Sequence, residues 1–296
     1  MNRDADVITI TRSRLDDFPL PVASDDDDKD SRGVVLVIGG SARVPGAIKL
    51  SGVAALKAGA GKLQIGTVKA AAIPLGIAVP EALVVSLPMT REGEIGRTAG
   101  TLLAERVAGA NSVLIGPGVS NQQAIAALIR GVLSHLPASA TLILDGAATV
   151  SLRANDSLLH ALASRAVLTP HAGEMASLLE VPIEEVRADP ANIAQHCADR
   201  FRAVTVLKGG ETWIAQPNET IMHFRDGKVG LGTSGSGDVL AGIIAGLAAR
   251  GALPRTAAAW GVWVHGSAGN NLSHTVGRTG FLAREILDEI PALVNE

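Results

Sequence analysis

The chain has 296 residues, of which 47% are hydrophobic and 19% are charged, with a net charge of −3. This length and apolar content suffice for one α/β unit with a large buried core. The balanced charge leaves no basic stripe, which excludes a nucleic-acid partner. The single cysteine, Cys197, excludes an internal disulfide framework and a multi-cysteine metal site, and we expect it to be an inert buried thiol.

The sequence shows no targeting or membrane-spanning segment. The N-terminus lacks a basic start followed by an apolar run. The longest strongly apolar stretch, 239–249, is too short to cross a bilayer. We therefore expect a soluble, cytoplasmic protein with no membrane contact. Asp25 to Lys29 (DDDDK) resembles an engineered protease site, but it leads directly into the first strand, so we interpret it as a native linker, with a tag scar as the alternative.

Apolar runs that end in glycine-containing turns mark the elements. In chain order the sequence predicts a strand at 34–38, a helix at 47–58, strands at 62–68 and 83–87, a helix at 98–108, a strand at 112–115, a helix at 122–136, a strand at 141–144, a helix at 158–164, a strand at 166–168, a helix at 174–179, strands at 204–207, 212–215 and 221–224, and helices at 239–250 and 256–272. This alternation predicts an α/β fold with a central, mostly parallel sheet and helices on both faces. Residues 1–30 are expected to be an extension or linker, and 31–296 one domain.

Small and polar residues follow the predicted strands. They are Gly39-Gly40-Ser41, Gly116-Pro117-Gly118, Asp145, Thr169-Pro170-His171 and Lys208-Gly209-Gly210. In open α/β sheets ligands bind beyond the carboxyl ends of the strands. We therefore expect these segments to line one crevice.

The most informative motif is Gly235-Ser236-Gly237-Asp238, which leads directly into an apolar helix. Glycines let backbone N–H groups approach an anion closely, and the start of a helix directs further N–H groups and the positive end of its dipole to the same point. Asp238 is placed to accept a proton from an attacking hydroxyl. The alternative is a flexible Gly/Ser loop in which Asp238 is the N-cap of the helix.

Residues 233–238 resemble the anion-hole and catalytic-base signature of the ribokinase-like superfamily. Further segments follow in order at 36–41 (LVIGGS), 45–47 (PGA), 58–61 (AGAG), 115–118 (IGPG), 168–174 (LTPHAGE) and 207–210 (LKGG). Together they resemble the ADP-dependent (S)-NAD(P)H-hydrate dehydratase family, over nearly the whole chain from Lys29. The implied fold is ribokinase-like, and the implied activity is ADP-dependent dehydration of hydrated NADH or NADPH, with release of AMP and phosphate.

The resemblance also implies a role for individual residues. Asp238 is the implied base, and the implied anion hole comprises Gly235, Ser236 and Gly237. The implied contacts to the hydrated dinucleotide come from Ala47, Gly118, His171 and Asp238, and those to ADP or AMP from Lys208, Gly209, Gly210, Glu211, Thr212 and Gly237. Mg²⁺ is expected on the nucleotide phosphates. Its protein ligands are unknown, with Glu174 as a candidate, although a carboxylate favoured by the helix dipole explains Glu174 slightly better.

Two positions depart from the family pattern, and the partners follow from the resemblance. Ala172 stands where the family usually has proline after the histidine, and Gly146-Ala147 after Asp145 lacks the family's second acidic residue. The segment before the first strand is too short for the epimerase domain that many bacterial members carry, so a separate epimerase is the expected partner. A homo-oligomer, a tetramer in the family, is also expected.

Several alternatives remain open at this stage. Lys208 could be solvated in a hairpin turn, Ala47 and Gly118 could serve packing alone, and His171 could be structural. We expect Trp260, Trp263 and His265 to be core or subunit contacts, with adenine stacking as the alternative. The alternative activities are a superfamily kinase that phosphorylates a hydroxyl of a vitamin precursor, and a nucleotide-binding sensor without catalysis. Neither ADP over ATP nor NADH over NADPH follows from any residue.

Overall fold

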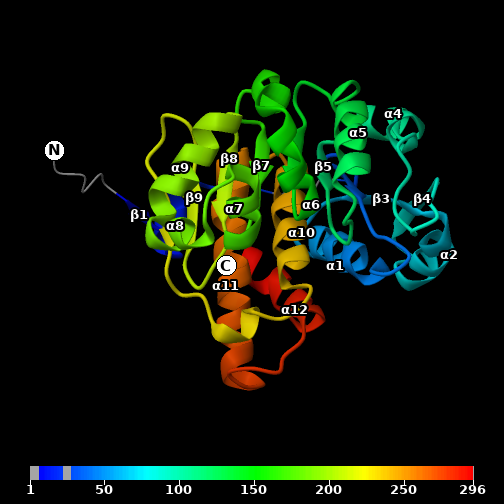
Figure 1. Ribbon diagram of the computed structural model, residues 1–296. Helices are drawn as coiled ribbons and strands as arrows, with labels where there is room; N and C mark the ends of the chain where they lie inside the picture. Colours follow the sequence, from blue (N-terminus) through cyan, green and yellow to red (C-terminus); the bar gives the residue numbers. More distant parts are fainter. Residues whose placement is uncertain (1–6, 23–27, 296) are drawn as a thin grey trace.

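The computed structural model describes residues 7–22 and 28–295, and its centre is a ten-stranded sheet (Figure 1). The strands are β1 (Ile8–Thr9), β2 (Val34–Ile38), β3 (Lys62–Val68), β4 (Ala82–Leu87), β5 (Ser112–Ile115), β6 (Thr141–Leu144), β7 (Ala166–Leu168), β8 (Val204–Leu207), β9 (Thr212–Ala215) and β10 (Met222–Phe224). Their order in the sheet is β1-β10-β9-β8-β7-β6-β5-β2-β3-β4. Only β9 runs antiparallel to its neighbours among these strands, which confirms the predicted mostly parallel sheet.

Helices cover both faces of this sheet. They are α1 (Pro45–Lys57), α2 (Lys69–Ala78), α3 (Ala99–Leu102), α4 (Ala104–Ala108), α5 (Gln122–Leu133), α6 (Ala147–Val150), α7 (Ala172–Leu179), α8 (Ile183–Ala188), α9 (Pro190–Phe201), α10 (Ser236–Ala249), α11 (Pro254–Thr275) and α12 (Ala283–Val294). Helices α1, α10, α11 and α12 pack against one another in one layer, whereas α5 to α9 follow one another along the other (Figure 1). Four 3₁₀ turns complete the described chain, at Ser13–Asp17, Ser151–Ala154, Asp156–Leu162 and Val229–Leu231.

The central strands are buried on both faces. Every residue of β5, β6 and β8 is buried, and most of them are apolar. Parallel strands covered by helices on both sides read as continuous apolar runs, which is why the sequence identified them. Cys197 is also fully buried, as expected, and burial raises the pKa of its thiol to about 12.

Helix α10 lies directly on α1 at glycine positions. A Cβ on Gly242 would lie 2.3 Å from the carbonyl oxygen of Ser51, and one on Gly246 would lie 2.4 Å from that of Ala55. The two backbones therefore touch where a side chain would have to stand. This contact fixes the position of α10 relative to the carboxyl edge of the sheet.

Two of the predicted helices differ in the structure. The helix predicted at 98–108 is broken at Leu103 into α3 and α4. The helix predicted at 158–164 is the 3₁₀ turn Asp156–Leu162, which ends because Ala163 adopts a left-handed conformation with φ 48°. Five helices were not predicted, namely α2, α6, α8, α9 and α12. Pro74 lies inside α2, and an internal proline argues against a helix in a sequence reading.

Part of the segment expected as an extension belongs to the sheet. Ile8–Thr9 pairs with β10 as an edge strand, and the Trp260 indole N–H donates to the carbonyl of Phe18 at 2.8 Å. Asp25, Asp26 and Asp27 lie outside the described residues, while the Asp28 carboxylate accepts the N–H groups of Asp30 and Ser31. Among residues 7–22 and 28–295, no helix has the length and apolar character needed to cross a membrane.

Candidate active site

The glycine-rich turn leads into α10 as the sequence predicts. Gly235 is the N-cap, and its φ of 91° is a left-handed conformation that favours glycine. Ser236 is the first helical residue, which puts Asp238 within the first turn and excludes it as the N-cap. The N–H of Ser236 donates to the carbonyl of Thr233 at 3.2 Å. The Ser236 N–H is therefore already bonded, whereas the N–H groups of Gly237 and Asp238 in the first turn have no preceding helical carbonyl to bind.

Asp238 has the ionisation expected of a base that works near neutral pH. The pKa of its carboxyl is raised to about 7, mainly by burial and then by Asp145, with Lys208 opposing the rise and Glu174 adding a little to it. A general base is most effective when its pKa lies close to the working pH. The surroundings of Asp238 thus suit it to accept a proton.

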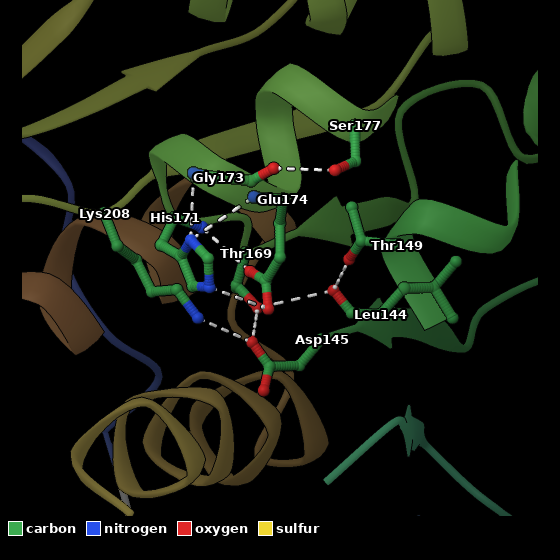
Figure 2. A network of polar contacts seen from close by, with 9 residues as sticks. All are labelled: Leu144, Asp145, Thr149, Thr169, His171, Gly173, Glu174, Ser177 and Lys208. Carbon is green, nitrogen blue, oxygen red and sulfur yellow. Dashed lines mark hydrogen bonds and ion pairs between the residues drawn. The ribbon is translucent and has the colours of Figure 1, made fainter. Parts of the chain in front are cut away.

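A buried ion pair lies beside Asp238. The ammonium of Lys208 donates to Asp145 Oδ1 at 2.8 Å, and the hydroxyl of Thr169 donates to the same oxygen at 2.6 Å (Figure 2). Burial alone would lower the pKa of Lys208, but Asp145 and Glu174 outweigh it and raise this pKa. The Lys208 Nζ lies 3.3 Å from the position a Cβ on Gly237 would occupy. Lys208 is therefore a cation held beside the glycine-rich turn and not a solvated residue of a hairpin.

Three strand ends supply this cluster. Asp145 follows β6, Thr169 follows β7 and Lys208 follows β8, and these strands are neighbours in the sheet. The backbone closes the arrangement, because the Lys208 N–H donates to the Pro170 carbonyl at 2.8 Å. Parallel neighbours end at the same edge, which is why residues far apart in the sequence meet here.

His171 and Glu174 form the start of α7 (Figure 2). The Nδ1 of His171 accepts the N–H groups of Gly173 at 3.0 Å and Glu174 at 3.3 Å, while Glu174 Oε2 accepts the N–H of His171 at 2.9 Å. This is a capping box. With Nδ1 accepting, the proton of a neutral ring sits on Nε2, which lies 3.3 Å from Glu174 Oε1. Both oxygens of Glu174 thus face His171, as expected for a carboxylate at a helix start.

A cavity of about 480 Å³ opens in front of this cluster. Its polar lining includes His171, Lys208, Gly209, Gly210, Thr212, Ser236, Gly237 and His265, and its apolar lining includes Phe224, Val229, Leu231, Leu240 and Val262. The structure thus brings together most residues expected to contact ADP. Glu211 is an exception, because its carboxylate binds His223 Nε2 at 2.8 Å outside this lining.

Ala47 and Gly118 lie elsewhere along the edge, in the first turn of α1 and in the turn after β5. A Cβ on Gly118 would lie 2.5 Å from the Val44 carbonyl and 3.0 Å from the Ala47 Cβ, and Gly118 has a φ of 68°. The two residues touch each other and do not line the 480 Å³ cavity. On the same helix as Ala47, Leu50 contacts the turn, with its Cδ1 2.6 Å from a Cβ built on Gly235.

His265, which we expected to be a core or subunit contact, lies against the glycine-rich turn. Its Nε2 lies 2.8 Å from the Ser236 hydroxyl and 3.1 Å from the Ser236 carbonyl. Trp260 and Trp263 are buried and in edge-to-face contact, as expected for core residues. Ser236 and His265 are separated by similar numbers of residues from the turn that joins α10 and α11. If the two helices are expected to pack as an antiparallel pair, this spacing places His265 opposite Ser236, and that was the signal that could have identified it.

A family model described as NAD(P)H-hydrate dehydratase matches residues 35–292. A protein of Xanthomonas campestris pv. campestris named ADP-dependent (S)-NAD(P)H-hydrate dehydratase is 46% identical over 290 residues, which is 98% of this chain and 96% of that protein. Other relatives are bifunctional NAD(P)H-hydrate repair enzymes, of which the chain spans about half the length.

Two crystal structures resemble the fold over almost its full length. A ribokinase-like superfamily protein of Enterococcus faecalis V583 has a TM-score of 0.84 at 28% identity, and the match covers 100% of this chain and 97% of that chain. The ADP/ATP-dependent NAD(P)H-hydrate dehydratase of Bacillus subtilis, co-crystallised with ATP and Mg²⁺, has a TM-score of 0.77 at 26% identity and covers 97% and 98%. The ribokinase-like fold expected from the sequence is confirmed.

Proposed function

Because the chain belongs to the NAD(P)H-hydrate dehydratase family, we propose that it uses ADP to dehydrate the S epimer of hydrated NADH and NADPH, restoring the reduced dinucleotide. It is a hydro-lyase. The observation that carries the assignment to this site is Asp238, with a pKa of about 7, in the first turn of α10 beside the Lys208 ammonium. A proton acceptor and a phosphoryl-binding group meet there.

The reaction follows from the difference between two leaving groups. Hydroxide leaves the hydrated ring poorly, whereas phosphate leaves well. Asp238 would take the proton of the ring hydroxyl while the oxygen of that hydroxyl attacks the β-phosphorus of ADP. The bond between the β-phosphorus and the AMP oxygen breaks as the new bond forms. The carbon–oxygen bond of the phosphorylated ring then breaks, the ring loses a proton, and phosphate and the reduced dinucleotide are released.

The chain's own groups stabilise the phosphoryl group in transit. The N–H groups of Gly237 and Asp238 at the start of α10 and the fixed ammonium of Lys208 would bind its oxygens. Charge is spread over these oxygens during transfer, so donors that are already in place stabilise it without reorganising. The Gly209-Gly210 turn and Thr212 would hold the rest of ADP in the cavity. Gly118 and Ala47 would contact the hydrated dinucleotide on the side of Asp238 toward β2 and β5, and His171 would contact it from the end of β7.

Mg²⁺ is proposed as the metal that accompanies the nucleotide. Among residues 7–22 and 28–295, no three His, Cys, Asp or Glu side chains form a cluster that could hold a metal ion. This fits a cation bound mainly by phosphates and water, as Mg²⁺ usually is. It would neutralise phosphate charge. Glu174 remains a candidate ligand, although its oxygens face His171.

The assembly and cellular setting are proposals as well. An exposed apolar stripe on α2, which includes Ile73 at 76% and Ile77 at 78% exposure, supports a homo-oligomer, for which we propose a tetramer in the cytoplasm. A dehydratase that takes only the S epimer leaves the R epimer behind. A separate epimerase is therefore the partner that would complete the repair.

The assay combines purified protein, Mg²⁺, hydrated NADH and either ADP or ATP. We expect the absorbance of the reduced nicotinamide ring to return, together with one AMP and one phosphate for each NADH when ADP is used. Protein without nucleotide is the control. No return of absorbance with either nucleotide would contradict the proposal, and accumulation of a stable phosphorylated product would point to a kinase.

A further inference from the structure

His265 on α11 contacts the first turn of α10. His265 Nε2 lies 2.8 Å from the Ser236 hydroxyl and 3.1 Å from the Ser236 carbonyl. Ser236 is 3% exposed and lies between two glycines, so its side chain is the part of the Gly235-Ser236-Gly237 turn that another element can hold. His265 also lines the 480 Å³ cavity with Lys208 and Gly237.

We propose that His265 is a positioning residue, which acts through Ser236 to hold the first turn of α10 so that its N–H groups point at the transferring phosphoryl group. The expected effect on catalysis rests on the proposed function. The fixing of the turn itself does not depend on the substrate.

The start of α10 needs such a contact because it lacks a cap of its own. Its N-cap is Gly235, so no side chain caps the first turn. A helix start without a side-chain cap leaves its first N–H groups to water or a ligand, so contacts from other elements hold its position. At α7, by contrast, His171 and Glu174 cap the helix within the same segment. At α10 a neighbouring helix supplies the contact, which leaves the N–H groups of Gly237 and Asp238 open to a ligand.

The charge of His265 suits this role. The pKa of its imidazole is lowered to about 4, because burial and, to a smaller degree, the ammonium of Lys208 outweigh the hydrogen bond with the Ser236 carbonyl, which raises it. The ring is therefore neutral near pH 7. A neutral ring holds Ser236 without adding a second cation beside Lys208. The Lys208 ammonium, held by Asp145, therefore remains the cation next to the turn.

Turnover of three variants tests the catalytic consequence. His265→Ala should lower kcat about 10- to 100-fold, the loss expected when a group is misplaced by about 1 Å, while the KM for ADP and the melting temperature stay near wild type. His265→Gln, which can still donate to the Ser236 carbonyl, should recover part of kcat. The double variant His265→Ala, Ser236→Ala should lose no more than His265→Ala alone, because both changes break one contact.

A matched control separates this role from the general loss of a histidine. His160 also binds a backbone carbonyl through Nε2, that of Arg200 at 3.0 Å, but it lies outside the cavity lining. His160→Ala should leave kcat unchanged. A His265→Ala kcat within twofold of wild type, a loss that follows the melting temperature, or no recovery in His265→Gln would overturn the catalytic role.

Amide hydrogen exchange tests the fixing of the turn independently of activity. Exchange over 235–240 should be faster in His265→Ala than in wild type and unchanged in His160→Ala. Equal exchange in His265→Ala and wild type would overturn the proposal even if the dehydratase assay succeeds. Conversely, faster exchange in an enzyme without dehydratase activity would support the positioning role and contradict only the proposed function.

Discussion

The first turn of α10 and the middle of the same helix both depend on glycine, for different reasons. At Gly237 the missing side chain leaves the backbone N–H groups of the first turn open beside Lys208 and Asp238. At Gly242 and Gly246 the missing side chains let α10 touch the backbone of α1. The same residue type thus gives a ligand access to the backbone at the start of the helix and lets two helices pack in direct backbone contact further along. Substitutions in the two regions should therefore affect different properties, activity in the first and stability in the second.

The largest difference between the effect on activity and the effect on stability is expected for Asp238→Asn. The amide cannot accept the hydroxyl proton as a base, so kcat should fall about 10²- to 10⁴-fold, or about 3 to 5 kcal/mol in the barrier. Asparagine has nearly the same shape, so ADP binding by calorimetry and the melting temperature should change little. Turnover near the wild-type value would show that the base lies elsewhere, and a large fall in melting temperature would show that the first turn also matters for stability.

The strands of this fold could be predicted from the sequence more completely than the helices. Strands such as Val34–Ile38 and Ser112–Ile115 are continuous apolar runs followed by glycine, so a short window identifies them. Helix α9 was missed although its buried residues from Ile193 to Phe201 recur at helical spacing, and α2 was missed because of Pro74. The pairing of Ile8–Thr9 with β10 could not be predicted, since two residues carry no periodicity and their partner is far away in the sequence.

The site was predictable where it is contiguous. Gly235 to Asp238 form one segment, and the helix after it was apparent from the sequence. The Lys208–Asp145 pair comes from two strand ends 63 positions apart, so the sequence indicated a shared edge but not the contact. His265 was missed because its partner Ser236 lies on another helix. The raised pKa of Asp238 also depends on burial and on neighbouring charges, which only the folded chain provides.

The second prediction concerns the middle of α10. Gly242→Ala would place a methyl group 2.3 Å from the carbonyl oxygen of Ser51 and 2.8 Å from the Cβ of Ala54. Backbone atoms cannot yield as a flexible side chain does, so we expect the free energy of unfolding to fall by about 1 to 3 kcal/mol. Urea unfolding measures this loss, and kcat should stay within a fewfold of wild type at temperatures where the variant is folded.

Gly76→Ala is the matched control, because Gly76 also lies inside a helix, α2. A Cβ there would meet only Val84 Cγ2, at 3.8 Å, which is ordinary contact. Replacing glycine by alanine in a helix without a clash should leave stability unchanged or raise it by about 0.5 to 1 kcal/mol. Equal effects of the two substitutions would show that close contact with α1 does not explain the glycine at 242.

The third prediction separates the two charges beside Asp238. Because the base must be ionised, kcat/KM should fall as the pH drops through about 7, the pKa of Asp238. Asp145 raises this pKa and Lys208 lowers it. Asp145→Asn removes the negative charge, so the acid limb should move to lower pH. Lys208→Met removes the positive charge, so the limb should move to higher pH.

The two variants control for each other, because each breaks the same buried ion pair and leaves one member without its partner. Both should therefore unfold more readily than wild type, and that shared loss cannot explain limbs that move in opposite directions. The measurement is kcat/KM for hydrated NADH from pH 5 to 9, at a temperature where all three proteins are folded. Acid limbs that moved in the same direction would contradict the opposite effects of the two charges on the pKa of Asp238. Acid limbs that did not move would mean that burial alone sets this pKa, and the Lys208–Asp145 pair would then serve to fix the Lys208 ammonium and not to tune the base.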